Sequence, residues 1–215
     1  MKKIELPKYT LGEEITNAIT HGLGALLAVA ALVLTVVYSS IHGNPWAIVA
    51  SAIYGFTLIL LYTMSTIYHS LKNNRAKKVF RVIDHCSIYL LIAGTYTPYT
   101  LVTLNGAIGW VLFGIVWGCA IIGIILNILD MKKFKKASML LYLIMGWAVI
   151  FTMKPLLENI AKPGFFLLLG GGVVYTIGAI LYGVGKKKKY IHSVFHLFVV
   201  AASVLQFLSI FFYVI

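Results

Sequence analysis

Long apolar stretches separated by short polar segments run along almost the whole chain. Crossing a hydrocarbon core of about 30 Å takes roughly 20 apolar residues in a helix. Helices also satisfy their backbone hydrogen bonds within one segment, as the water-free bilayer core requires. The pattern therefore predicts an all-α integral membrane protein with seven spans, at residues 18–41, 46–70, 82–103, 107–129, 137–154, 164–184 and 191–214.

The connections between these predicted spans are short, and several contain turn residues. Examples are HGNP at 42–45, NG at 105–106 and KPG at 162–164. We find no long loop that could form a second domain. We therefore expect one seven-helix membrane domain over residues 1–215, in which residues 1–17 form a cytoplasmic N-terminal segment.

Composition supports the membrane interpretation and excludes a soluble domain with a polar surface. Hydrophobic residues make up 60% of the chain and charged residues only 11%. The two cysteines, Cys86 and Cys119, lie inside apolar stretches and do not indicate a disulfide framework. Their expected role is packing.

The distribution of cations predicts how the bundle is oriented. Of the 18 Lys and Arg residues, three precede the first span, five lie between spans two and three, four between spans four and five, and four between spans six and seven. The opposite side has only Lys154 and Lys162. The positive-inside rule then places the N-terminus in the cytoplasm and the C-terminus outside, in a multi-pass protein of the plasma membrane. Topology and anionic lipid headgroups account for the net charge of +12, so no nucleic-acid partner is expected.

Ionisable residues gather at the predicted cytoplasmic ends of four different spans. Five of the six histidines lie there, namely His21, His69, His85, His192 and His196. Asp84, the only acid well inside a span, lies at the same level. Because ionisable groups within a membrane are costly, such a gathering indicates a functional site.

The spacing of these residues suggests a metal site. His192 and His196 are four residues apart, so both imidazoles lie on one helix face and can reach one ion. His69 can supply a third imidazole from a facing helix, with Ser65 one turn before it. Three imidazoles with an open fourth position describe a catalytic Zn²⁺ site, in which Asp84 could hold the attacking water. Ligation rich in imidazole and poor in carboxylate favours zinc over magnesium or calcium.

Structural interpretations of the same residues stay open. Histidines near an interface can contact headgroups, and the Ser65 hydroxyl can bond to a carbonyl of its own helix. His85 points about 100° away from the preceding acid, which favours a supporting or interface role. His21, Glu13 and Glu14 could cap or anchor the first helix, and their role is not assigned.

Two further positions carry packing predictions. Gly114 and Gly118 form a small-xxx-small pair, which usually marks close helix packing. Pro98 is expected to kink the third span. We find no inverted repeat, which argues against a transporter, and the sequence leaves open whether the bundle forms a homo-oligomer.

Four separated motifs resemble the hemolysin III family of bacterial membrane proteins. They are EEITNAITHGLG at 13–24, STIYHSL at 65–71, IDHCSIYLLIAGTYTPY at 83–99 and HSVFHLFVV at 192–200. That family belongs to the superfamily of progestin and adipoQ receptors and more distantly resembles alkaline ceramidases. The resemblance covers essentially the whole chain.

This resemblance implies a seven-helix bundle with a cytoplasmic N-terminus and a zinc ion near the cytoplasmic face. The residues matching the zinc ligands are His69, His192 and His196. Asp84 matches the acid that positions the attacking water, and Ser65 matches the serine of the S-x3-H motif.

The leading functional hypothesis is a zinc-dependent hydrolase acting on an amide or ester of a membrane lipid. In this hypothesis Asp84 is the general base and Ser65 helps to bind the oxyanion or the water. One alternative is a non-catalytic protein of lipid sensing or membrane homeostasis, in which the metal only locks the helices. The other is a cytolytic, haemolytic pore-forming protein. A pore does not require three histidines and an acid at one depth in the membrane.

Overall fold

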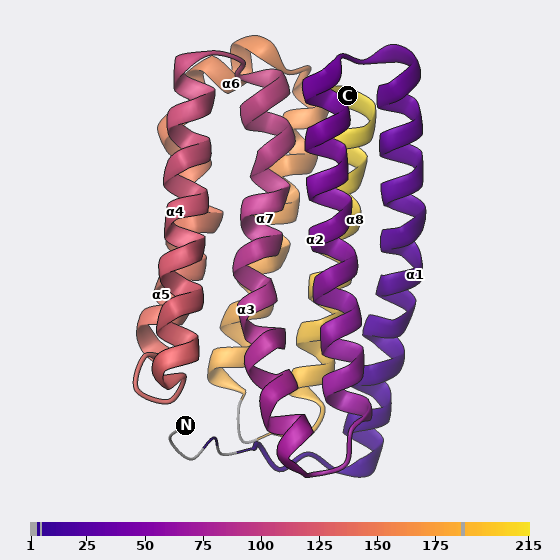
Figure 1. The fold of residues 1–215 in the computed structure, drawn as a ribbon, viewed down its shortest axis with the longest axis vertical. Helices are drawn as coiled ribbons and strands as arrows, with labels where there is room; N and C mark the ends of the chain where they lie inside the picture. The colour runs from indigo at the N-terminus through magenta and orange to yellow at the C-terminus, as the bar shows by residue number, and fades with distance from the viewer. Residues whose placement is uncertain (1–3, 5, 186–187) are drawn as a thin grey trace.

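The long helices of this protein run side by side along one axis (Figure 1). The structure is a computed structural model that describes residue 4 and residues 6–185 and 188–215. The α-helices are α1 (Leu11–His42), α2 (Pro45–Ser70), α3 (Arg75–Pro98), α4 (Ala107–Asp130), α5 (Lys135–Gly146), α6 (Met153–Asn159), α7 (Lys162–Val184) and α8 (Ile191–Tyr213). A π-helical turn, η1 (Tyr99–Thr103), continues α3, and a 3₁₀ turn, η2 (Ala148–Thr152), joins α5 to α6.

The predicted membrane helix bundle is confirmed. In the described part of the chain, six segments are long and apolar enough to cross a membrane: Leu11–His42, Pro45–Ser70, Ala107–Asp130, Lys135–Asn159, Lys162–Val184 and Ile191–Tyr213. The seventh long helix, α3, is less apolar because cations occupy its first turns, at Arg75, Lys77, Lys78 and Arg81. The start of α1 and the end of α8 lie at opposite ends of the bundle, as an odd number of passes requires (Figure 1).

The basic connections lie at the same end of the bundle as the N-terminus. They precede α1, join α2 to α3, join α4 to α5 and join α7 to α8. Four of the cations counted from the sequence, Lys2, Lys3, Lys186 and Lys187, are outside the described residues. Lys154 and Lys162, the two cations predicted for the opposite side, belong to α6 and α7 at the other end.

The first helix begins earlier than the predicted start at residue 18. A capping box fixes its start, because the Glu13 backbone N–H donates to Thr10 Oγ1 at 3.3 Å and the Thr10 N–H donates to Glu13 Oε2 at 2.8 Å. The chain therefore becomes helical at Leu11, and Glu14 and Asn17 are helical residues of α1.

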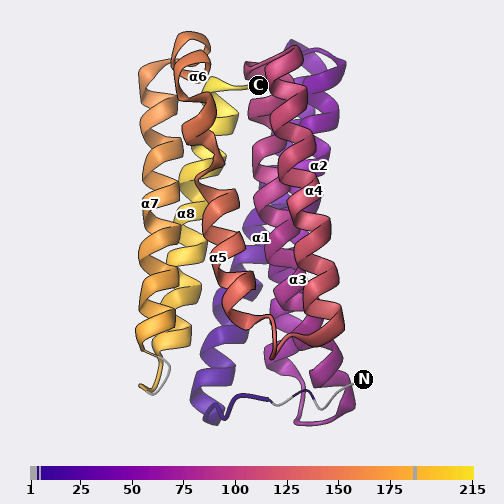
Figure 2. The same ribbon diagram turned by 90° about the vertical axis from the view of Figure 1, so that its left-hand side faces the viewer.

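The fifth span, predicted as one helix over 137–154, is broken in its middle. The Tyr96 hydroxyl of α3 donates to the Gly146 carbonyl at 2.9 Å and accepts the Val149 N–H at 2.9 Å. A side chain that takes over backbone hydrogen bonds in this way interrupts a helix. The chain consequently passes from α5 through η2 into α6, and Figure 2 shows this irregular crossing in front of α8.

Helix packing also corrects one prediction made from glycine spacing. A Cβ added at Gly114 or at Gly118 would meet nothing within 4 Å among the described residues, so this pair makes no close helix contact. On the same helix, a Cβ at Gly123 would collide with the Tyr89 ring, which is fully buried. The close approach of α3 and α4 therefore depends on Gly123.

We predict that Gly123→Ala destabilises the bundle, because Tyr89 has no free space into which it can move. Overpacking of this kind costs about 1–3 kcal/mol. Gly114→Ala is the matched control on the same helix. It should leave stability unchanged or raise it by up to about 1 kcal/mol. Thermal unfolding in detergent measures both variants. Equal melting temperatures for the two would contradict the assigned packing.

Candidate metal centre

Three histidine side chains from two helices converge at the N-terminal end of the bundle. His69 comes from the last turn of α2, and His192 and His196 come from the first turns of α8. One ligand atom from each lies within 4.8 Å of the others. The His192 Nε2 atom is 3.3 Å from His69 Nε2 and 3.2 Å from His196 Nε2.

The two separations measured from His192 match those expected around one tetrahedral ion. Imidazole nitrogens bound to Zn²⁺ lie about 2.0–2.1 Å from it, which places two of them about 3.3–3.4 Å apart at tetrahedral angles. The same Nε2 atom of each ring points into the group, and His69 and His196 are buried. The three-histidine group could therefore hold a metal ion.

A carboxylate orients the His69 ring from the opposite side. Glu14 Oε2 is 2.7 Å from His69 Nδ1, which fixes the proton on Nδ1 and leaves Nε2 free to bind a metal. Lys77 Nζ donates to the other oxygen, Glu14 Oε1, at 2.6 Å. The Asn17 amide nitrogen lies 3.4 Å from the same His69 nitrogen. Glu14 thus links helices α1, α2 and α3 at the metal centre.

A second acid of α1 sets the position of α8. The Tyr190 backbone N–H donates to Glu13 Oε1 at 2.8 Å, immediately before α8 begins. Farther into that helix, the Ser193 hydroxyl donates to Asn17 Oδ1 at 2.7 Å. The two contacts place the face of α8 that carries His192 and His196 against the start of α1.

Aromatic rings cover the histidines on both sides. The His21 ring of α1 stacks on His196 with centroids 3.5 Å apart and planes 7° apart. From the segment before α1, the Tyr9 ring stacks on His192 at 5.1 Å and 11°. Burial raises the pKa of Tyr9, so its phenol is neutral at physiological pH. Each of these two histidines thus has an aromatic ring stacked against it.

Asp84 and Ser65 lie near the histidines, as the sequence suggested. Both are buried and line one cavity together with His21, His192 and His196. The Ser65 hydroxyl has no hydrogen-bond partner within the described residues. Its polar atom is therefore available to a bound molecule.

His85 stays outside the three-histidine group. Its Nδ1 lies 3.0 Å from the Arg81 carbonyl and 3.6 Å from Asp84 Oδ2. The alternative of His85 as a supporting neighbour of Asp84 agrees with this position.

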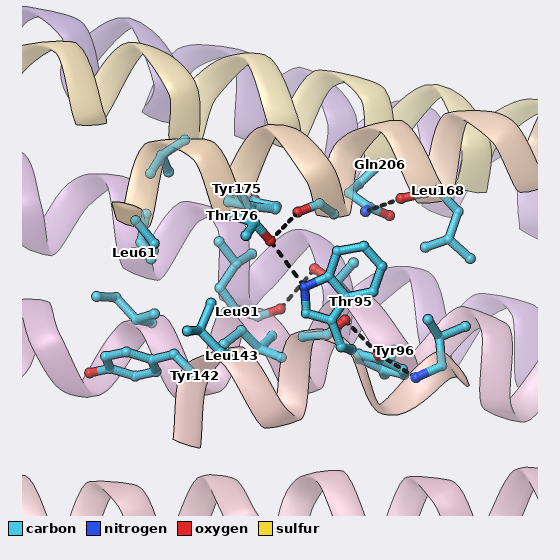
Figure 3. Close-up of a pocket in the computed structure, with 18 of the residues that line it drawn as sticks. Leu61, Leu91, Thr95, Tyr96, Tyr142, Leu143, Leu168, Tyr175, Thr176 and Gln206 are labelled. Atoms are coloured by element: carbon cyan, nitrogen blue, oxygen red, sulfur yellow. Dashed lines mark hydrogen bonds between the residues drawn. The ribbon is translucent and has the colours of Figure 1, made fainter. Parts of the chain in front are cut away.

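The cavity that begins at these residues extends far into the apolar interior. It encloses about 230 Å³ and is bounded by α3, α5, α7 and α8. Figure 3 shows its middle part, where leucine, tyrosine and threonine side chains from different helices surround the space. Gln206 lines its far end and follows His196 by ten residues on α8, which corresponds to about 15 Å along a helix axis.

Beyond the histidines, several polar groups along this cavity are hydrogen-bonded to other groups of the protein. Gln206 Nε2 donates to the Leu168 carbonyl at 3.0 Å, and Trp147 Nε1 donates to Thr176 Oγ1 at 3.0 Å (Figure 3). The Tyr175 hydroxyl lies 2.7 Å from Ser203 Oγ. The wall beyond the histidines is therefore apolar in character and suited to hydrocarbon.

Comparison with protein family models tests the resemblance that the four sequence motifs suggested. The model of the family described as "Haemolysin-III related" matches residues 9–207. The chain belongs to this family. The match includes every residue of the metal centre described above.

Curated relatives cover nearly the whole chain. It is 48% identical to "Hemolysin-3" of Bacillus cereus over 94% of this chain and 92% of that protein. It is 42% identical to "Hemolysin-3 homolog" of Bacillus subtilis (strain 168), over 95% of this chain and 96% of that protein. Human "Monocyte to macrophage differentiation factor" is 27% identical over 94% of this chain and 85% of that protein. No solved structure matches the chain significantly.

The structure adds two residues whose role the sequence left unassigned. Glu14 contacts His69, and His21 stacks on His196. Asn17 lies between them on the same face of α1. The sequence contains a signal for this face, because residues 14, 17 and 21 are spaced as neighbours on one side of a helix.

We predict that His192→Ala/His196→Ala abolishes metal binding. The purified wild-type chain should carry about one metal ion, since three imidazoles complete one site. Elemental mass spectrometry in detergent measures the content, with His42→Ala at the opposite end as control. Equal metal content in the double variant and the control would reject the site.

We predict that Glu14→Gln keeps the metal site but weakens it. Loss of a partner that orients a ligand typically lowers metal affinity 10–100-fold. Chelator competition measures the affinity, and Glu158→Gln at the opposite end serves as control. An affinity within about twofold of wild type would show that the Glu14 contact does not orient His69.

Proposed function

We propose that this protein is a zinc-dependent hydrolase that cleaves an amide or ester bond of a membrane lipid. The observation that carries the proposal is the position of the three-histidine group at one end of an apolar cavity inside a membrane bundle. An imidazole donor set favours zinc among the common divalent ions.

Zn²⁺ bound to three imidazoles supplies Lewis-acid polarisation of a carbonyl and lowers the pKa of water to about 7. Two residues of the chain would carry out the remaining steps of the reaction. Asp84 would accept the proton of the attacking water as general base. Ser65 would donate its hydroxyl hydrogen to the oxygen on which negative charge develops.

The cavity would hold an acyl chain of the substrate. Its lining residues are mainly leucine, isoleucine, tyrosine and phenylalanine, and it begins where Asp84 and the histidines lie. A lipid bound in this way places its carbonyl at the metal centre and its hydrocarbon among the helices. Burial of the chain would supply binding energy at about 0.8 kcal/mol for each CH₂.

We also propose that the metal centre faces the cytoplasm. Of the 14 Lys and Arg residues that the structure describes, 12 belong to segments at that end of the bundle, and the positive-inside rule assigns such segments to the cytoplasm. The N-terminus would then be cytoplasmic and the C-terminus external, in the cell membrane.

Two non-enzymatic functions would leave different signatures. In a lipid sensor, the metal would cross-link α2 and α8 without turnover. The names of the Bacillus relatives indicate haemolysis. For a cytolysin, lysis of red cells should survive loss of all three histidines. Only the hydrolase requires a base beside the metal.

We predict that Asp84→Asn abolishes hydrolysis and retains zinc. The amide keeps the shape of the side chain but cannot accept the proton, and general base catalysis is worth about 10²–10⁴-fold in rate. Release of fatty acid from a panel of lipid amides and esters measures turnover, while elemental analysis measures zinc. Glu158→Gln is the control. Undiminished turnover in Asp84→Asn would refute this mechanism, and absence of turnover by wild type across the panel would favour the sensor.

A further inference from the structure

A second, larger cavity opens beside the metal centre on the N-terminal end of the bundle. We call it the vestibule, and it encloses about 800 Å³. Its walls come from residues 6–10, the start of α3, the connection between α4 and α5, and the start of α8. It adjoins the apolar cavity, because five residues line both: His85, Met139, Tyr142, Tyr182 and His192.

The vestibule is cationic. Six cations are among its described lining residues: Lys8, Arg81, Lys132, Lys135, Lys188 and Lys189. Its two acids are engaged by backbone donors, since Glu13 accepts the Tyr190 N–H at 2.8 Å and Asp130 accepts the Lys133 N–H at 3.0 Å. The six cations outnumber the two acids, and a concave wall with such an excess of positive charge attracts anions.

Along three separate stretches of the chain, the lining residues change from cations in the vestibule to apolar residues in the other cavity. On α3, Arg81 lines the vestibule, His85 lies at the junction, and Leu91 lines the apolar cavity. An amphiphile with an anionic end would match this order.

The two other stretches repeat it. Lys189 is followed by His192 at the junction and then by Val199 in the apolar cavity. Lys135 is followed by Tyr142 at the junction and then by Leu143 in the apolar cavity. Three stretches that change together define one axis, with the histidines between its charged and apolar ends.

We propose that the vestibule binds the phosphate-bearing headgroup of an anionic membrane lipid whose acyl chain enters the apolar cavity. This inference rests on the proposed function and names its substrate class. Lysine and arginine side chains recognise phosphate by charge-assisted hydrogen bonds. The carbonyl that links headgroup and chain would then lie beside His192, between the two cavities.

The positive-inside rule alone would also place lysines at this end of the bundle. The connection between α4 and α5 separates the two explanations. Lys132 of this connection and Lys135 at the start of α5 line the vestibule, whereas their neighbours Lys133 and Lys136 do not. Removing either pair changes the net charge equally, so only a site inside the vestibule distinguishes them.

The test measures binding of dioctanoyl phosphatidic acid to the purified full-length chain in neutral detergent. Dioctanoylglycerol has the same acyl chains without the phosphate, and inorganic phosphate has no chains. Phosphatidic acid should bind at least about tenfold tighter than either, and Lys132→Gln/Lys135→Gln should weaken it by about tenfold or more, because each lysine near such a surface contributes about 1 kcal/mol. Lys133→Gln/Lys136→Gln should change it less than about twofold.

Three results would overturn the proposal. Equal weakening by both lysine pairs would assign the effect to general surface charge. Equal affinity for phosphatidic acid and dioctanoylglycerol would remove the headgroup contact. Binding of inorganic phosphate as tightly as the lipid would identify a site for a soluble anion instead.

The binding measurement is independent of turnover and of metal. A chain that binds phosphatidic acid selectively but cleaves no lipid would refute the proposed hydrolase and leave the headgroup site intact. Hydrolysis of neutral lipids that is indifferent to the Lys132/Lys135 pair would refute the headgroup site and leave the hydrolase intact.

Discussion

One charged contact orients the three-histidine group, the Glu14 carboxylate between His69 and Lys77. Inside a membrane bundle, an ionised carboxylate needs partners that replace water. Here the two oxygens have separate partners, one from α2 and one from α3, while Glu14 itself belongs to α1. The same contact that compensates the acid therefore aligns three helices and turns His69 Nε2 toward α8.

Sequence reasoning succeeded where the geometry is local or imposed by the bilayer. Apolar length predicted the helices, a separation of four residues predicted the pairing of His192 with His196, and a common membrane level brought in His69. It was incomplete where the answer depends on contacts between helices. The roles of Glu14 and His21 follow from which face α1 turns inward, and the open surroundings of Gly114 and Gly118 follow from where α4 packs. The sequence around these residues does not specify which face of α1 turns inward or where α4 packs.

The break in the fifth span has the same origin and bears on the site. Its cause is the Tyr96 hydroxyl from α3, which replaces backbone hydrogen bonds between Gly146 and Val149. A continuous helix would keep those bonds to itself. Beside the break, Trp147 reaches Thr176 of α7 and forms part of the cavity wall. One buried tyrosine thus shapes the space in which the proposed acyl chain would lie.

Membrane depth connects the fold to the proposed chemistry. The three histidines lie at helix ends, and one of them, His192, lines both the cationic vestibule and the apolar cavity. In a bilayer, the ester or amide linkages of lipids occupy the corresponding level, beneath the headgroups and above the hydrocarbon. A lipid that keeps its ordinary depth would therefore bring its carbonyl to the level of His69, His192 and His196. Because polar residues are costly inside the bilayer, they gather at one end of a membrane protein. The polar ester and amide bonds of the surrounding lipids lie at the same level.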